Sequence, residues 1–379
     1  FRPTLLGRHL FGRMKLPPAI LSLPAIFVAT VVLIPLGYLV LRTIGAGTDS
    51  WEVLFRLRVL EILGRTMLLV TGVTAASIGL AVPIAWLTVR TNLPMRHLWA
   101  VLTVLPLVIP SYIGGFIVIV ALGPKGMLQK LLEGPFGFER LPEIYGFPGA
   151  MLTLTFLSYP YVLLTVRAAL KRMDRTLEES SRGLGHNPWS TFFQVILPQL
   201  KPSIGAGALL VSLYTLSDFG AVSLLRYETF TWAIFVQYES ALDRTMGAIM
   251  SLALVTLALG IVALEALSRG SSKYYTSGPG TSSPPEPVQL GSWRWPALAF
   301  CGAVVSMSLV IPISVLGYWL FRGVSANEPL LIQWGPTLNS LYVGGLAAGA
   351  TVIAALPVAV ISVRYPGIFS SLVEKATYI

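Results

Sequence analysis

The sequence predicts an all-α polytopic membrane protein, and three features support this fold class. Of the 379 residues, 54% are hydrophobic and 12% are charged, with a mean hydropathy of +0.73, whereas soluble domains average about 25% charged residues. A bilayer core about 30 Å thick requires about 20 apolar residues per helix, and the chain contains several windows of that length. No alternation of period two dominates, which excludes an outer-membrane barrel.

Apolar windows divide the chain into about eight predicted transmembrane helices. One window, 202–225, is interrupted only by Asp218. The first window is too long for the apolar region of a signal peptide, so we expect it to be a retained span. The other seven windows are 16–41, 66–89, 98–124, 144–166, 245–264, 295–321 and 328–363.

The distribution of Lys and Arg predicts the orientation of these spans. Cytoplasmic loops retain positive charge, and with a cytoplasmic N-terminus 17 of the 27 Lys and Arg residues fall on predicted cytoplasmic segments. The net charge of +10 therefore reflects membrane topology. We expect a lipid bilayer, and no nucleic acid, as the partner of these basic residues.

Two pairs of similar segments indicate an internal repeat. Residues 36–42 (LGYLVLR) are matched by 316–322 (LGYWLFR), and 81–90 (AVPIAWLTVR) by 355–364 (ALPVAVISVR). The pairs occur in the same order with nearly equal offsets, as in many transporter folds built from repeats. The alternative is that any two membrane helices look alike, but the shared Pro and terminal Arg favour a duplication.

The sequence between the sixth and seventh windows is rich in Ser, Gly and Pro, which is typical of flexible connectors. It divides the chain into three predicted parts. Residues 1–267 form a first repeat of six spans, residues 268–294 a flexible cytoplasmic linker, and residues 295–379 the first two spans of an incomplete second repeat.

A polar insert between the fourth and fifth windows carries several helix signals. Thr176 and Glu179 have the spacing of a capping box. Gly185 can end that helix, and the Asn-Pro pair at 187–188 can begin another. We expect Pro198 to stop the second helix. The insert is therefore predicted to be two short cytoplasmic helices joined by a Gly-centred bend.

Each short helix has an apolar side, which needs a cover because helices of this length are marginal alone. The cover could be the chain's own spans or the lipid headgroup layer, or a groove of a cytoplasmic partner. The residues alone leave these alternatives open. The apolar residues are Leu177, Leu184, Trp189, Phe192, Phe193 and Ile196.

The insert resembles the "EAA" loop in permease subunits of binding-protein-dependent ABC importers. That loop has a Glu followed by two small residues, a Gly four positions later, and an Ile-x-Leu-Pro ending after ten more. Every spacing agrees, with Ser in place of both Ala residues and Val in place of Ile. The matching residues are Glu179, Ser180, Ser181, Gly185, Val195, Leu197 and Pro198.

The resemblance implies a six-helix permease core of the type I importer class, followed by the start of a second repeat. It further implies that residues 176–202 are coupling helices, which dock into a dimer of cytoplasmic ABC ATPases. Glu179 either faces that partner or caps its own helix. We add Phe192 and Phe193 as inferred contacts. No P-loop motif occurs, so ATP and magnesium are expected on the partner, with no cofactor on this chain.

Asp218 is the one acidic residue inside a predicted span, and charge in a membrane marks a functional candidate. We expect Asp218, Ser217 and Tyr161 on the translocation pathway. The alternatives are a structural carboxylate that bonds Tyr214 or Ser217, or one that reaches toward the nearby external surface. Separately, three prolines are expected to break backbone pairing in the third and fourth spans: Pro106, Pro110 and Pro160.

The motifs at 217–220 (SDFG) and 159–161 (YPY) resemble permeases of ferric-iron importers, in which two such halves are fused. Thiamine, polyamine or oxyanion importers are the alternatives. No Cys or His cluster forms a metal site in the spans, so iron ligands are expected on a periplasmic binding protein. The resemblance implies a bacterial inner-membrane transport subunit that is not an enzyme. A non-transporting membrane scaffold or receptor is the alternative of another class.

Overall fold

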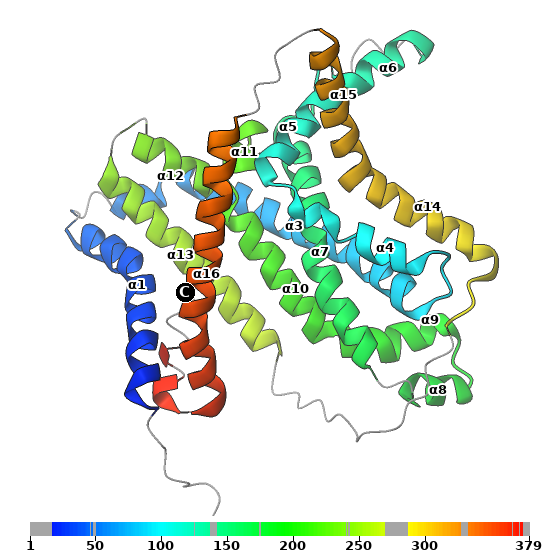
Figure 1. Ribbon diagram of the computed structural model, residues 1–379, viewed down its shortest axis with the longest axis horizontal. Helices are drawn as coiled ribbons and strands as arrows, with labels where there is room; N and C mark the ends of the chain where they lie inside the picture. Colours follow the sequence, from blue (N-terminus) through cyan, green and yellow to red (C-terminus); the bar gives the residue numbers. More distant parts are fainter. Residues whose placement is uncertain are drawn as a thin grey trace, which may run out of the picture. The chain divides into compact units, whose positions relative to one another are not determined.

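The computed structural model describes residues 17–45, 51–124, 126–136, 142–173, 176–239, 243–269, 287–326 and 333–365, together with 47, 241, 367–370 and 372–373. The described chain is helical, apart from one isolated bridge between Thr91 and Val288. The long helices in Figure 1 are α1 (Ala19–Ile44), α3 (Leu57–Arg90), α7 (Phe147–Arg172), α10 (Leu197–Ser217), α13 (Arg244–Arg269) and α16 (Trp334–Arg364).

Shorter elements interrupt or connect the long helices. In the first half they are η1 (Val53–Phe55), α4 (Arg96–Leu102), η2 (Leu105–Val108), α5 (Ser111–Leu122), α6 (Met127–Phe136), α8 (Thr176–Gly183), α9 (Pro188–Thr191) and the π-helical turn η3 (Phe192–Ile196). Later in the chain they are α11 (Gly220–Leu224), α12 (Phe230–Glu239), η4 (Gly291–Trp293), α14 (Arg294–Val305), the π-helical turn η5 (Ser306–Val310) and α15 (Ile311–Ser325).

Eight helical segments within the described residues are long and apolar enough to cross a membrane, and each overlaps one predicted window. The predicted all-α membrane fold is therefore confirmed. The segments are Ala19–Ile44, Leu57–Arg90, Ser111–Lys130, Phe147–Arg172, Phe192–Ser217, Arg244–Leu267, Gly291–Ser325 and Trp334–Arg364.

The third predicted span is broken between α4 and α5, as its prolines predict. Pro106 lies in the single turn η2, and Pro110 precedes the first residue of α5. Arg167 of α7 reaches the end of α4, where its Nη1 donates a hydrogen bond to the carbonyl of Ala100 at 2.6 Å. Pro160 lies inside α7, which continues through it. Because proline has no N–H, the carbonyl of Phe156 loses its helical partner there, as expected, but the fourth span is not interrupted.

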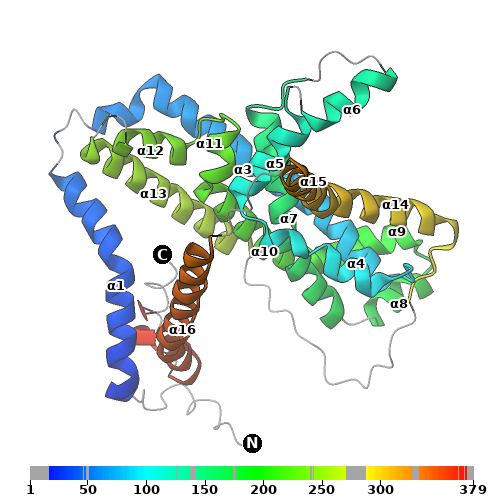
Figure 2. The same cartoon turned by 45° about the horizontal axis from the view of Figure 1, so that its top comes forward.

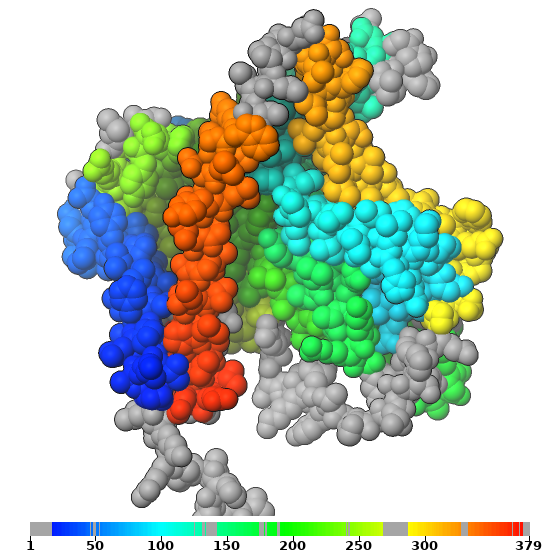
Figure 3. Space-filling model, viewed as in Figure 1, coloured from blue at the N-terminus to red at the C-terminus, as the bar shows by residue number. Residues whose placement is uncertain are grey.

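The chain forms two compact units, and the smaller contains Phe1–Gly47 with Glu328–Ile379. In this unit α1 packs beside α16, as both views of the ribbon show (Figures 1 and 2). Ala25 and Ala29 of α1 are buried against Ile361 of α16. Small alanine side chains allow two membrane helices to approach closely, and the space-filling view shows them in contact near the base of the unit (Figure 3).

The larger unit, Thr48–Asn327, is built on three mutually packed helices, α3, α7 and α10. Hydroxyl pairs bond across them, with Thr74 Oγ1 3.0 Å from Ser212 Oγ and Ser77 Oγ 3.4 Å from Ser158 Oγ. The closest approach of α7 and α10 is at Gly207. A Cβ atom there would lie 2.6 Å from the Val162 Cα, so this crossing requires glycine.

The seventh predicted span, α14–η5–α15, belongs to this larger unit and packs on first-half helices, including α5, α7 and α3. Val315 is buried against Ile117 of α5, and Cys301 against Leu87 of α3. The first helix of each predicted repeat thus packs on helices of the other repeat: α14–α15 on the first, and α1 on α16 of the second. The repeat boundaries themselves stay a prediction.

The segment that leads into α14 is bound to the end of α3. Val288 donates its N–H to the Arg90 carbonyl at 2.8 Å and accepts from the Asn92 N–H at 3.1 Å. The Asn92 side chain bonds Gln289 Oε1 at 2.5 Å and the Leu290 N–H at 2.9 Å. Residues 270–286 of the predicted linker lie outside the described residues, so their flexibility stays a prediction, whereas 287–290 are anchored.

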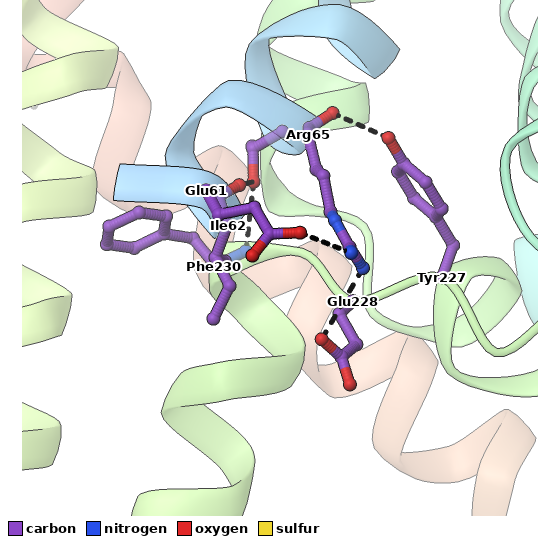
Figure 4. A network of polar contacts seen from close by, with 7 residues as sticks. Glu61, Ile62, Arg65, Tyr227, Glu228 and Phe230 are labelled. Atoms are coloured by element: carbon purple, nitrogen blue, oxygen red, sulfur yellow. Dashed lines mark hydrogen bonds and ion pairs between the residues drawn. The ribbon is translucent and has the colours of Figure 1, made fainter. Parts of the chain in front are cut away.

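The segment that joins α11 to α12 is held against the first turns of α3 (Figure 4). Arg65 forms ion pairs with Glu61 at 2.5 Å and Glu228 at 3.5 Å. Tyr227 donates its hydroxyl to the Arg65 carbonyl at 3.0 Å. Burial raises the pKa of Tyr227, which keeps this hydroxyl protonated as a donor. The Phe230 N–H adds a bond to a threonine hydroxyl of α3 at 3.1 Å.

We predict that cutting the chain within 270–286 leaves the two fragments associated. The contacts of α14–α15 with α5 and α7 remain after cleavage, because none of them uses the cut segment. A protease site inserted there, followed by size-exclusion chromatography in mild detergent, measures the association. Separate elution of the fragments after cleavage contradicts the prediction, and the uncut insertion variant is the control.

Candidate functional site

The predicted bend in the polar insert is present, and Gly185 forms it. The Gly185 N–H bonds the Arg182 carbonyl at 2.9 Å, and the His186 N–H bonds the Ser181 carbonyl at 3.3 Å. These two bonds are the Schellman arrangement that ends a helix. Gly185 has φ +89°, a conformation that strains residues with a Cβ. The end of α8 therefore depends on glycine, as the sequence predicts.

The second helix begins at the predicted Asn-Pro pair. Asn187 Oδ1 accepts the Ser190 N–H at 2.7 Å, which is the bond of an N-cap residue, and Pro188 is the first residue of α9. The two short helices are joined by their side chains as well, because Ser181 Oγ lies 3.2 Å from Thr191 Oγ1 in a buried contact. Ser181 is 8% exposed, so a small residue is needed there.

The prediction that Pro198 stops the second helix was wrong. From α9 the chain passes through the π-helical turn η3 directly into α10, with Pro198 in its first turn. A proline clashes with the carbonyl four residues earlier in a regular α-helix, whereas the π-helical turn shifts the bonding by one residue, so that the Leu197 N–H bonds the Phe192 carbonyl. Gln199 Nε2 bonds the Val195 carbonyl at 3.1 Å. The insert is therefore continuous with the fifth span.

Part of the insert's apolar side is covered by the chain's own spans, and part is exposed. Ile196 is buried in the main core at 3% exposure, and Phe192 is packed against the same core. The Phe192 ring meets Trp86 of α3 edge to face, with centroids 6.4 Å apart. Phe193 and Leu184 are 57% and 81% exposed. Of the two inferred aromatic contacts, only Phe193 is largely accessible.

The remaining predicted loop residues lie on α8, at the bend, on η3 and at the start of α10. Ser180 and Gly185 are exposed, whereas Val195, Leu197 and Pro198 are half-buried. Glu179 lies on α8, but its side chain lies outside the described residues, as do those of Thr176, Leu177 and Trp189. The capping box between Thr176 and Glu179 therefore stays a prediction.

Arg90 is a site residue that sequence reasoning assigned only to topology and to the repeat. It is 3% exposed and its Nη2 lies 3.5 Å from the Met173 carbonyl, just after the last residue of α7. A positive charge at a helix C-terminus stabilises the free carbonyls there. Arg90 therefore connects α3 to the start of the insert. The signal in the sequence was the arginine shared by the two repeats, since Arg90 and Arg364 each end their helices.

Asp218 does not lie inside a span, as the sequence suggested, but at the break between α10 and α11. It is 7% exposed, and its Oδ1 accepts the N–H groups of Ala221 at 3.0 Å and Val222 at 3.3 Å. The carboxylate therefore caps α11. The Thr231 hydroxyl bonds the Asp218 carbonyl at 2.7 Å. The structure shows neither of the predicted bonds to Tyr214 or Ser217; the two backbone N–H groups and the Ser111 hydroxyl donate to the carboxylate instead.

The other two predicted pathway residues lie nearby on the long helices. Ser217 is exposed at the end of α10, and its hydroxyl bonds the Tyr214 carbonyl at 3.1 Å. Tyr161 of α7 is half-buried, and its ring centroid lies 5.7 Å from that of Tyr214. Tyr161, Tyr214 and Ser217 thus belong to the same pair of helices, α7 and α10, that the insert connects. Their part in a pathway stays a prediction.

Comparison with known proteins identifies the family. The family described as "binding-protein-dependent transport system inner membrane component" matches residues 77–269. The Fe(3+)-transport system permease protein FbpB 2 of Haemophilus influenzae is 34% identical over 371 residues, which cover 96% of this chain and 69% of that protein. The chain therefore belongs to the family of inner-membrane permeases of binding-protein-dependent importers.

Other relatives share parts of the chain. The molybdenum transport system permease protein ModB of Haemophilus influenzae is 31% identical over 212 residues, covering 53% of this chain and 90% of that protein. A solved bacterial ABC transporter, involved in import of the acidic polysaccharide alginate, has a TM-score of 0.52 at 18% identity, covering 66% of this chain and 96% of the matched one. The likeness to that structure supports the importer fold alone.

We predict that Asp218→Asn preserves the stability of the purified chain, because an amide oxygen can accept the same two N–H bonds. Asp218→Ala removes the cap and is expected to cost about 1–2 kcal/mol, measured from thermal unfolding in detergent. Equal destabilisation by both variants contradicts a capping role. A stable Asp218→Asn variant with impaired uptake supports the pathway hypothesis.

We predict that Gly207→Ala separates α7 from α10 and destabilises the chain by about 1–3 kcal/mol. Its added methyl lies 2.6 Å from backbone and cannot be absorbed by a side-chain rotation. Gly260→Ala is the matched control, since nothing lies within 4 Å of its added Cβ. Thermal unfolding midpoints measure the difference. Similar midpoints for the two variants contradict the close crossing.

Proposed function

We propose that this chain is the membrane-spanning subunit of an ATP-driven importer, coupled to a separate ATPase through residues 176–202. The observation that supports the coupling is the rigid attachment of an accessible helix pair to the spans. Phe192 and Ile196 are packed in the main core, while Phe193 and Leu184 are exposed. A partner that grips the exposed side can therefore displace the helices to which the buried side is attached.

The attachment reaches three spans. The helix pair continues without a break into α10, contacts α3 through Trp86, and follows α7, whose end is bonded by Arg90. A displacement of the pair is therefore transmitted to α3, α7 and α10 together. Predicted pathway residues Tyr161, Ser217 and Asp218 lie on or directly beside α7 and α10, so the same displacement reaches them.

We propose ferric iron as the cargo, delivered by a periplasmic binding protein to a permease in the bacterial inner membrane with a cytoplasmic N-terminus. The relative that covers 96% of this chain carries the name of an Fe(3+)-transport permease. Relatives with molybdenum and sulfate transport names match over shorter parts, which keeps oxyanions as the alternative cargo. Within the described residues no three His, Cys, Asp or Glu side chains group as a metal site.

We predict that Phe193→Asp releases the ATPase without unfolding the permease. Phe193 is 57% exposed and its ring contacts that of the neighbouring Phe192, so a carboxylate there costs little folding energy. In an apolar groove of the ATPase the same carboxylate would be buried without a partner. Co-purification with the ATPase is expected to fall at least tenfold, and ferric-iron uptake by cells with it.

The matched control is Met95→Asp, a change at an exposed apolar side chain, 64% exposed, between α3 and α4. It is expected to leave both readouts within about twofold of wild type, as surface changes generally do. Retention of the ATPase by Phe193→Asp, with uptake intact, excludes the coupling role. If Phe193→Asp loses the ATPase while the wild-type chain takes up molybdate rather than iron, the coupling is supported and the cargo is replaced.

A further inference from the structure

A groove separates α7 and α10 on the insert side of their crossing. The helices touch at Gly207 and Val162. Toward the insert, a groove of about 470 Å³ opens between them. Its walls are mostly small side chains, which leave the space unfilled: Ala168, Ala169, Pro202 and Ala206.

The polar groups of the groove are donors. Arg172, in the last turn of α7, lines it together with Ser203 and Thr165, and none of the lining residues is acidic. Thr165 donates its hydroxyl to the Val162 carbonyl at 2.9 Å, so the available donors are the Arg172 guanidinium and the Ser203 hydroxyl. A guanidinium can form two parallel hydrogen bonds to one oxyanion. A guanidinium and a hydroxyl in a groove without acidic lining residues suit a tetrahedral oxyanion.

The electrostatic surroundings favour the same class of ligand. Lys171 and Lys201 are exposed at the adjoining ends of α7 and α10. They do not line the groove. A carboxylate also lies close by, since Glu265 Oε1 is 3.6 Å from the position of a Cβ on Gly205, but Arg172 and the two lysines outnumber it and raise the local concentration of anions. With the orientation proposed above, this end of the two helices faces the cytoplasm. Basic pockets between membrane helices on that side bind anionic lipid headgroups.

We propose that the groove between Arg172 and Ser203 binds a tetrahedral oxyanion. Two sources have this chemistry: the phosphate of an anionic phospholipid, whose chains would lie along the alanine-lined walls, and a free oxyanion such as sulfate or molybdate. The site does not depend on which cargo the permease carries, nor on its coupling to an ATPase. An oxyanion bound by Arg172 of α7 and Ser203 of α10 would connect the two helices next to the insert.

The test uses the full chain in phosphatidylcholine nanodiscs, with and without phosphatidylglycerol, and separately with sodium sulfate or sodium molybdate. Thermal unfolding reports binding, and native mass spectrometry counts lipid adducts. Arg172→Gln is expected to weaken binding at least tenfold. Lys171→Gln is the matched control, because it removes a neighbouring charge from the same helix turn without altering the groove. It also corrects for the general stabilising effect of sulfate.

A second variant, Ser203→Asp, keeps Arg172 and places a carboxylate in the groove, so it is expected to abolish binding. Stabilisation by phosphatidylglycerol alone assigns the site to a lipid headgroup. Stabilisation by sulfate or molybdate in phosphatidylcholine assigns it to a free oxyanion. The proposal is overturned if neither ligand binds, or if Arg172→Gln and Lys171→Gln weaken binding equally.

Discussion

Where a membrane-embedded helix breaks, backbone N–H and C=O groups lose their helical partners. They need other partners within the protein, because hydrocarbon offers them no hydrogen bond. In this chain a side chain meets that requirement at two helix breaks and at one π-helical turn. Arg167 bonds the Ala100 carbonyl at the end of α4, and Gln199 bonds the Val195 carbonyl at the π-helical turn. Asp218 accepts the free N–H groups of α11. The breaks are therefore stable features of the spans, and they lie beside the insert and the predicted pathway residues.

The two short helices of the insert are ordered by their contacts with each other and with the spans. Helices as short as α8 and α9 are marginal alone, so their order comes from attachment. Ser181 and Thr191 join the two helices to each other, and Phe192 joins them to Trp86 of α3. Because η3 leads without a break into α10, no loose joint separates the accessible surface from the spans. In the proposed coupling, a displacement applied at Phe193 would be transmitted through packed side chains, because no flexible loop lies between it and α10.

The packing of the repeats follows from their ends. Residues 287–290 bind the end of α3 through Asn92, and this contact places α14 against first-half helices. In the smaller unit, α1 packs on α16. The first helix of each predicted repeat therefore packs against helices of the other predicted repeat. Sequence similarity indicates the two predicted copies. It does not indicate which copy a given helix packs against, because the helices of both copies have similar apolar surfaces.

Features that depend on residues close together in the sequence could be predicted from the sequence alone. The spans follow from apolar length, and the bend follows from Gly185 and Asn187, since a backbone dihedral and a cap are local properties. Features that depend on distant neighbours could not be. The continuation of the helix through Pro198, the inward Phe192 beside the outward Phe193, and the capping by Asp218 emerged only from the folded chain. The partner of Phe192, Trp86, lies on a distant helix. The bonds of Asp218 and Leu197 are local, but they exist only because α10 ends at Ser217 and follows a π-helical turn, and the packing of α10 on α3 and α7 decides both.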